Sequence, residues 1–173
     1  MLRAFKKRQA GVTLFEVLLV LFVAAFIAAA VGTIYAKVTL TFKQNQLQTG
    51  VQQLAANITA TYSSTSGADY SNLATGAVIS GGLAPDDMHV GNIPVNPWNT
   101  TAGWDVGVGS SATSYKVTLY SIPSGACSTL YQALSKISGA APLTINGTAA
   151  QDASTALASC NKSDGNTIIL NVN

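Results

Sequence analysis

Gly11-Val12-Thr13-Leu14-Phe15-Glu16-Val17-Leu18-Leu19-Val20-Leu21 is the stretch that opens the main apolar run of this chain. The run continues to Ala36, and its 25 residues from Val12 contain a single charged side chain, that of Glu16. As an α-helix it would be about 37 Å long, which exceeds the roughly 30 Å of a bilayer's hydrocarbon core. The run therefore predicts a membrane-spanning helix near the N-terminus.

Basic residues are concentrated ahead of this helix. Four of the nine in the chain, Arg3, Lys6, Lys7 and Arg8, lie within the first eight positions. Such a basic flank stays in the cytoplasm, so we expect the C-terminal part to be exported. Beyond Gly11, five basic residues stand against seven acidic ones without a basic cluster. This distribution argues against a nucleic-acid-binding surface.

Two interpretations of the apolar run are open on physical grounds. The basic start and the small residues Ala28-Ala29-Ala30 would suit a cleaved secretory signal, whereas the length of the run suits a retained anchor. Glu16 bears on the choice, because a carboxylate at bilayer depth costs about 2.5–3.5 kcal/mol on insertion scales and usually marks a specific partner. The simpler alternative is that Glu16 extends to the membrane interface.

The residues from Lys6 to Leu21 closely resemble the leader of type IV prepilins and related pseudopilins. That leader is short and basic, ends in glycine, and is followed by a hydrophobic residue, Thr-Leu, an apolar residue and glutamate. The resemblance covers residues 1 to about 35. It implies that a prepilin peptidase cuts after Gly11 on the cytoplasmic side and N-methylates Val12. The apolar helix would then be retained as the assembly element.

The resemblance also implies an assembly role for Thr13 and Glu16. After cleavage the Val12 amine is a cation, and an isolated carboxylate inside a fibre would be poorly solvated. Pairing Glu16 of one subunit with the Val12 amine of its neighbour satisfies both charges. Because losing one partner of a buried pair typically costs about 3–5 kcal/mol, we expect this pair to fix the axial offset of adjacent helices.

The helix is predicted to continue beyond Ala36. Apolar residues recur at spacings of four, three, four and four, at Leu47, Val51, Leu54, Ile58 and Tyr62. This stripe predicts an amphipathic helix, so one helix would run from Val12 to about Tyr62. We divide the chain into a cytoplasmic leader (1–11), a transmembrane assembly half (12–36), an amphipathic half (37–62) and a globular head (63–173).

The head is predicted to mix strands and helices. Residues 63–101 suggest an irregular connecting region with a short helix. Strands are expected at 104–108, 115–122 and 167–172, and helices at 127–137 and 152–158. The fold class is therefore α+β, with a mostly antiparallel sheet. By resemblance this is the type IV pilin fold, in which the apolar half of the long helix protrudes and its second half packs on the sheet.

Cys127 and Cys160 are the only cysteines. An even pair in an exported region indicates one disulfide, worth roughly 3–4 kcal/mol by loop closure; two free buried thiols are the alternative. The region between them resembles the disulfide-bounded variable segment of type IV pilins. A metal site would need more ligands than these and the lone His89, and Asp86-Asp87 are better explained as turn residues. We expect no metal and no cofactor.

Subclass signals are mixed. Asn96-Pro97-Trp98 resembles type IVb pilins of the plasmid thin-pilus kind, and the chain length and Val12 at the first mature position also favour type IVb. The eleven-residue leader is shorter than type IVb leaders usually are.

No enzyme motif accompanies these features. The chain is 48% hydrophobic and 9% charged, and it contains no zinc motif, phosphate loop or nucleophile elbow, so we expect no enzymatic activity. The resemblance implies a homopolymeric fibre subunit, here a major pilin. Its partners would be copies of itself, the inner membrane, a prepilin peptidase, and an assembly platform and ATPase. It would reside in the bacterial inner membrane and then in an extracellular pilus serving adhesion, aggregation or conjugative mating.

Two other functions stay open at this point. A minor pilin or type II secretion pseudopilin shares the same assembly helix, although a disulfide-closed C-terminal segment favours a pilus. An unrelated single-pass or secreted binding protein would have no use for Glu16.

Overall fold

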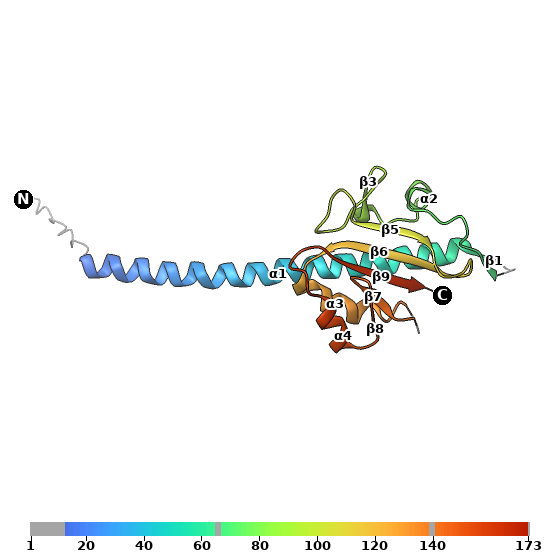
Figure 1. The fold of residues 1–173 in the computed structure, drawn as a ribbon. Helices are drawn as coiled ribbons and strands as arrows, with labels where there is room; N and C mark the ends of the chain where they lie inside the picture. The colour runs from blue at the N-terminus through green and yellow to red at the C-terminus, as the bar shows by residue number, and fades with distance from the viewer. Residues whose placement is uncertain (1–12, 65–66, 139–140, 173) are drawn as a thin grey trace, which may run out of the picture. The chain divides into compact units, whose positions relative to one another are not determined.

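The computed structural model describes residues 13–64, 67–138 and 141–172 (Figure 1). The chain forms two compact units, one ending at Thr39 and the other beginning at Leu40. The elements in chain order are α1 (Leu14–Tyr62), β1 (Ser63–Ser64), β2 (Gly67–Ala68), α2 (Thr75–Ser80), the 3-10 helix η1 (Asp86–Met88), β3 (His89–Val90), β4 (Ile93–Pro94), β5 (Trp104–Val108), β6 (Tyr115–Ile122), α3 (Ser124–Leu134), β7 (Leu143–Ile145), β8 (Thr148–Ala150), α4 (Ala153–Ser159) and β9 (Asn166–Val172).

The long N-terminal helix is present as predicted. α1 comprises 49 residues without interruption, and neither Gly32 nor Gly50 breaks it. Its composition favours this, because it lacks proline and is rich in leucine and alanine. The expected start at Val12 lies outside the described residues.

In the second unit, α1 contributes one face to the hydrophobic core. Leu47, Val51, Leu54 and Ile58 are each at most 1% exposed, which confirms the predicted stripe. Gly50 is buried on the same face because Met88 packs directly on it. A Cβ at Gly50 would lie 2.6 Å from the Met88 sulfur, so a larger residue here would force the Met88 side chain to shift.

A five-stranded sheet forms the other side of the core. The strand order is β5-β6-β9-β7-β8, and every pairing is antiparallel. The C-terminal strand β9 therefore lies between β6 and β7 (Figure 1). β5 and β6 have the predicted bounds, and β9 begins one residue earlier than predicted, at Asn166.

The strands β7 and β8 were not predicted, so the sheet is larger than expected. Each strand has three residues, and of these six residues only Leu143, Ile145 and Ala150 are buried. The alternation of buried and exposed residues is therefore too short to be recognised in the sequence. The Asn146-Gly147 turn joins them with positive φ angles of 51° and 87°. An Asn-Gly pair between apolar residues is a hairpin signal, and the sequence prediction missed it.

We call residues 124–160 the disulfide region. Its two helices, α3 and α4, are shifted from their predicted positions. α3 begins and ends three residues earlier than expected, at Ser124 and Leu134. The start is set by Pro123, whose φ is −66° and whose carbonyl accepts a hydrogen bond from the Cys127 N–H. α4 lies one residue later than expected, because Asp152 caps it rather than joining it.

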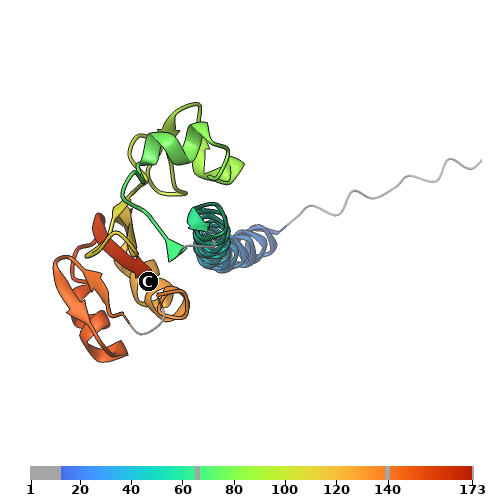
Figure 2. The ribbon, with the colours of Figure 1, turned by 90° about the vertical axis from the view of Figure 1, so that its right-hand side faces the viewer.

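The connecting segment between α1 and β5 is mostly irregular, as predicted, and contains α2, η1 and two short hairpins. Figure 2 shows this green segment and the orange-to-red disulfide region on different sides of α1. Asn96 anchors the segment: it is 3% exposed, and its Nδ2 donates to the carbonyls of Gly103 and Tyr120. Trp104 is buried and donates from Nε1 to the Met88 carbonyl at 2.7 Å, while Trp98 is partly buried against the core.

Candidate assembly site

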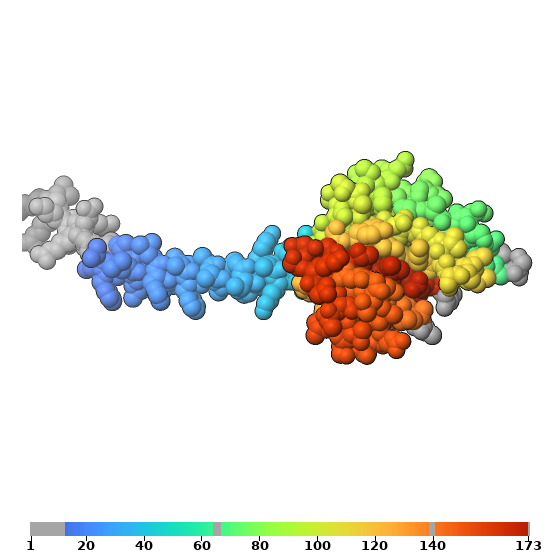
Figure 3. Space-filling view, in the orientation of Figure 1, coloured from blue at the N-terminus to red at the C-terminus, as the bar shows by residue number. Residues whose placement is uncertain are grey.

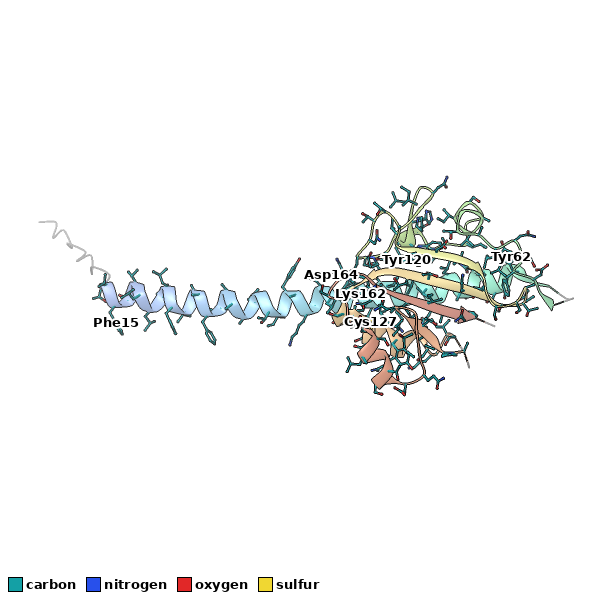
Figure 4. All side chains as sticks on the ribbon, viewed as in Figure 1. Phe15, Tyr62, Tyr120, Cys127, Lys162 and Asp164 are labelled. Atoms are coloured by element: carbon teal, nitrogen blue, oxygen red, sulfur yellow. A yellow bond between two sulfur atoms is a disulfide. The ribbon has the colours of Figure 1, made fainter. Side chains whose placement is uncertain are left out.

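The first unit presents an apolar helical surface with no covering. Every described side chain from Thr13 to Val38 is exposed. The largest exposed fractions include 80% for Leu14, 74% for Phe15 and 73% for Phe22. These side chains project from all sides of the helix, with Phe15 labelled in Figure 4. An apolar surface of this size marks an interaction with lipid or protein.

Within the described residues, α1 is the one helix long and apolar enough to cross a membrane. This helix contains the predicted span, so its composition is consistent with membrane anchoring.

The start of this helix is capped by the side chain of Thr13. Thr13 lies just before α1, and its Oγ1 accepts a hydrogen bond from the Glu16 backbone N–H at 3.3 Å. The Thr13 carbonyl accepts from the Val17 N–H at 3.2 Å. Thr13-Leu14-Phe15-Glu16 has the Thr-x-x-Glu spacing of a capping box. Thr13 therefore has a local role in starting the helix, beside its predicted role in assembly.

Glu16 is exposed in the first turn of α1. A carboxylate there interacts favourably with the positive end of the helix dipole. Gly11 and Val12, the predicted processing residues, lie outside the described residues. The pairing of Glu16 with a neighbour's Val12 amine stays a prediction.

In the second unit, polar side chains fasten the head to α1. The buried amide of Gln44 donates to the Gly125 carbonyl at 3.2 Å, at the start of α3. Asn57 donates from its side chain to the Leu83 carbonyl at 2.9 Å. Tyr115 is fully buried and donates to the Ala55 carbonyl at 3.0 Å. Burial raises the pKa of Tyr115, and so keeps the phenol protonated as a donor.

The disulfide joins the two helices of the disulfide region, α3 and α4. Cys127 in α3 is completely buried, and it is bonded to Cys160, the C-cap residue of α4. Figure 4 labels Cys127 at the α3 end of this bridge. The single disulfide predicted for this fold is present.

An asparagine network beside the disulfide was missed by sequence reasoning. Asn166 is fully buried, and its Nδ2 donates to the carbonyls of Ile122 and Lys162. Its Oδ1 accepts from the Lys162 N–H and from Nδ2 of Asn146. Asn166 thus joins the end of β6, the loop after Cys160 and the β7–β8 turn. An asparagine at a strand start has too many ordinary explanations to be singled out from sequence.

Among the described residues, no group of three or more His, Cys, Asp or Glu side chains could hold a metal ion. An open hollow beside α3 is lined by neutral residues such as Tyr131, Ser135 and Gln151.

Similarity to known families agrees with this architecture. The family model described as PilS N terminal matches residues 42–173, and the prokaryotic N-terminal methylation motif matches residues 6–32. The chain belongs to the PilS family. This PilS-family chain is a pilin subunit, and the members of its family are structural subunits.

A solved pilin structure resembles this PilS-family chain in fold. A crystal structure of the type IVb pilin from Salmonella typhi is 23% identical, with a TM-score of 0.55, and the match covers 73% of this chain and 97% of that one. An NMR structure of the type IVb pilin PilS from Salmonella typhi is 22% identical, with a TM-score of 0.48, covering 74% and 94%. At this level of identity, the crystal structure is evidence for the pilin fold and for nothing beyond the fold. No curated protein shows significant similarity to the chain.

Proposed function

We propose that this pilin is the major structural subunit of a type IVb pilus, cleaved after Gly11 by a prepilin peptidase and N-methylated on Val12. The observation that carries the proposal is the exposed apolar half of α1, which overlaps the methylation motif at residues 6–32. A secreted domain would not keep such a helix, because its exposed apolar surface favours aggregation in water. A fibre subunit needs it for cohesion.

The proposed sequence of events begins in the inner membrane. Residues 1–11 stay in the cytoplasm as the leader, and residues 12–36 span the bilayer. Residues 37–62 and the head from 63 to 173 lie on the far side, where the disulfide forms in an oxidising compartment. After cleavage, an assembly platform and ATPase move the subunit into the fibre, where Glu16 pairs with a neighbour's Val12 amine.

The outer surface of the fibre would then be formed by the head. Figure 3 shows that both the connecting segment (green to yellow) and the disulfide region (orange to red) contribute to the surface of the head. We propose that this surface serves adhesion, aggregation or conjugative mating.

The test is an intact mass of the mature protein from cells that express a prepilin peptidase. The proposal expects a chain that begins at methylated Val12 and lacks two hydrogens for the disulfide. A chain beginning near Val31 would identify an ordinary secreted domain and would refute the assembly mechanism. Quantifying the subunit in sheared fibres then separates a major pilin, which dominates the fibre, from a minor one.

A further inference from the structure

One dipeptide of the disulfide region is suited to a spontaneous covalent change. Asn146-Gly147, the turn between β7 and β8, is the one Asn-Gly pair in the chain. Asparagine is thermolabile, and most so before glycine, because a glycine nitrogen without a neighbouring Cβ has open access to the asparagine side chain. Gly147 is exposed, so water reaches the turn.

The reaction of such a pair is an intramolecular cyclisation. The Gly147 nitrogen attacks Cγ of Asn146, the new C–N bond replaces the Cγ–Nδ2 bond, and the proton of the Gly147 N–H leaves with Nδ2 as ammonia. Water then opens the cyclic imide at either of its carbonyls, and the residue becomes aspartate or isoaspartate. Water is the one co-reactant, and nothing is oxidised or reduced.

The turn conformation opposes this cyclisation. The φ angles of 51° at Asn146 and 87° at Gly147 are those of a type I′ turn. Closing the imide ring requires rotation about the Asn146 Cα–C bond, which takes the residue out of this conformation. The pairing of Ile145 with Thr148 on either side of the turn resists that rotation.

Hydrogen bonds hold the Asn146 side chain as well. Its Nδ2 donates to the Ser159 carbonyl and to Oδ1 of Asn166, at 2.8 Å each. Its Oδ1 accepts from the Thr167 N–H at 3.0 Å, and its backbone N–H donates to the Thr167 carbonyl at 2.9 Å. Cγ of Asn146 therefore reaches the Gly147 nitrogen only when several of these bonds break together.

The partners of Asn146 lie next to the disulfide. Ser159 precedes Cys160, which ends α4 and is bonded to the fully buried Cys127. Asn166 binds the backbone of the loop that follows Cys160. α4 and the β7–β8 hairpin are neighbours in the fold (Figure 1). Reducing the bridge thus loosens the segment to which the Asn146 amide is bound.

We propose that Asn146 is a deamidation site that the disulfide-bonded head keeps closed and that reduction of the Cys127–Cys160 bridge opens. The product does not fit the site, because a carboxylate has no N–H to donate to Ser159 and Asn166. Reoxidation of the cysteines does not restore the amide. A subunit that has once been reduced is therefore marked permanently, whether or not it has entered a fibre.

The test follows deamidation of the full-length chain in detergent at slightly alkaline pH. Three states are incubated: the disulfide-bonded chain, the reduced chain, and the chain unfolded in denaturant. Every sample is then reduced, alkylated and digested with trypsin, which releases residues 137–162 as one peptide. Replacement of the amide nitrogen by oxygen raises the mass of this peptide, and fragmentation locates the change.

The disulfide-bonded chain should react at Asn146 at least about tenfold more slowly than the unfolded chain, because the reaction is limited to rare openings of the turn. Reduction of the bridge should raise the rate several-fold. A disulfide-bonded chain that reacts as fast as the unfolded one would overturn the proposal, and so would a rate that reduction leaves unchanged.

Asn161 is the control within the same peptide. It is exposed and adjacent to Cys160, so reduction frees it too, but the side chain of Lys162 hinders the following nitrogen. Asn161 should react much more slowly than Asn146 in the unfolded chain. Gly147→Ala should slow the reaction of Asn146 there, because it hinders the attacking nitrogen. Equal rates at Asn146 and Asn161 in denaturant would contradict the assignment of the site.

Asn166→Ala separates the hydrogen bonds from the disulfide. It removes one acceptor of the Asn146 amide while both cysteines stay paired, so Asn146 should react several-fold faster in the disulfide-bonded chain. A cooperative thermal transition shows that this variant is folded, and a folded variant with the wild-type rate would refute the role of the network. Cys127→Ser with Cys160→Ser is the second variant, which should raise the rate without any reductant.

Discussion

Tyr115 of β6 and Ala55 of α1 are joined by a hydrogen bond of 3.0 Å, from the buried phenol to the backbone carbonyl. The Tyr115 hydroxyl also lies 3.2 Å from Oγ1 of Thr59, one turn further along the helix. The Tyr115 ring stacks at a tilt on Tyr70, with 4.8 Å between ring centroids. The central sheet and the second half of α1 are therefore linked by a directional polar contact inside an apolar core.

Tyr115→Phe removes this hydrogen bond while keeping the ring. We expect the free energy of unfolding of the head to fall by about 1 kcal/mol, the usual net value of such a bond. Denaturant unfolding of the chain without residues 1–39, which form a separate compact unit, would measure it. Tyr120→Phe, at a half-buried position of the same strand, is the control and should change stability less. Equal effects of the two substitutions would contradict the structural role of the bond.

Gly50→Ala should destabilise the head although alanine favours helices. The new methyl would lie within 3 Å of the Met88 side chain, and overpacking a core costs about 1–3 kcal/mol. Gly76→Ala in α2, where nothing lies within 4 Å, is the matched control and should be neutral or stabilising. If Met88→Ala is introduced first, Gly50→Ala should become favourable by up to about 1 kcal/mol, the propensity difference. Thermal midpoints of the four variants would show whether the two sites interact.

Cys127→Ser should lower the free energy of unfolding by about 2–5 kcal/mol, as loss of a native disulfide in a small exported domain does. Cys160→Ser should have a similar effect, and the double substitution should cost little more than either single one, because one bond is lost in each case. The measurement is the thermal midpoint under non-reducing conditions. A midpoint equal to that of the wild type would contradict a stabilising role for the bridge.

Asp152 should make the stability of the disulfide region sensitive to acid. The Thr155 backbone N–H and the Ser154 hydroxyl bond to its carboxylate and hold its pKa below the ordinary value of 3.8. Because the folded pKa is lowered, this contribution is present above pH 3.8 and is lost as pH falls through the lowered pKa. Asp152→Asn keeps an acceptor but does not titrate. The melting difference between wild type and variant should therefore change below pH 3.8 and stay constant above it.

Glu16→Ala should be cleaved after Gly11 yet assemble poorly. The substitution leaves the leader intact but removes the partner proposed for the Val12 amine, and an unpaired buried charge costs about 3–5 kcal/mol. The mass of the mature chain and the quantity of sheared fibre are the two measurements. Glu16→Asp, which keeps the charge on a shorter side chain, should recover part of the assembly. Wild-type fibre levels from Glu16→Ala would contradict the pairing.

The sequence by itself determined the long helix and its division into two kinds of surface. The apolar run up to Ala36 and the stripe from Leu47 to Ile58 are local patterns of apolar residues. Each contains enough apolar positions that a single polar residue does not obscure it. β5 and β6 were equally clear, because alternation over neighbouring residues specifies a half-buried strand. The cysteine pair and the methylation motif could likewise be recognised in the sequence, because each is defined by residue type and spacing alone.

Only the tertiary structure decided how these pieces meet. β7 and β8 are too short to be stable alone, and they exist because β9 supplies hydrogen-bond partners on one side. The burial of Gly50 depends on Met88, which is distant in sequence, and the four bonds of Asn166 join segments brought together by folding. Such contacts involve one residue pair each and leave no periodic trace in the sequence. Their free energy comes from desolvated partners that only the folded chain places within reach.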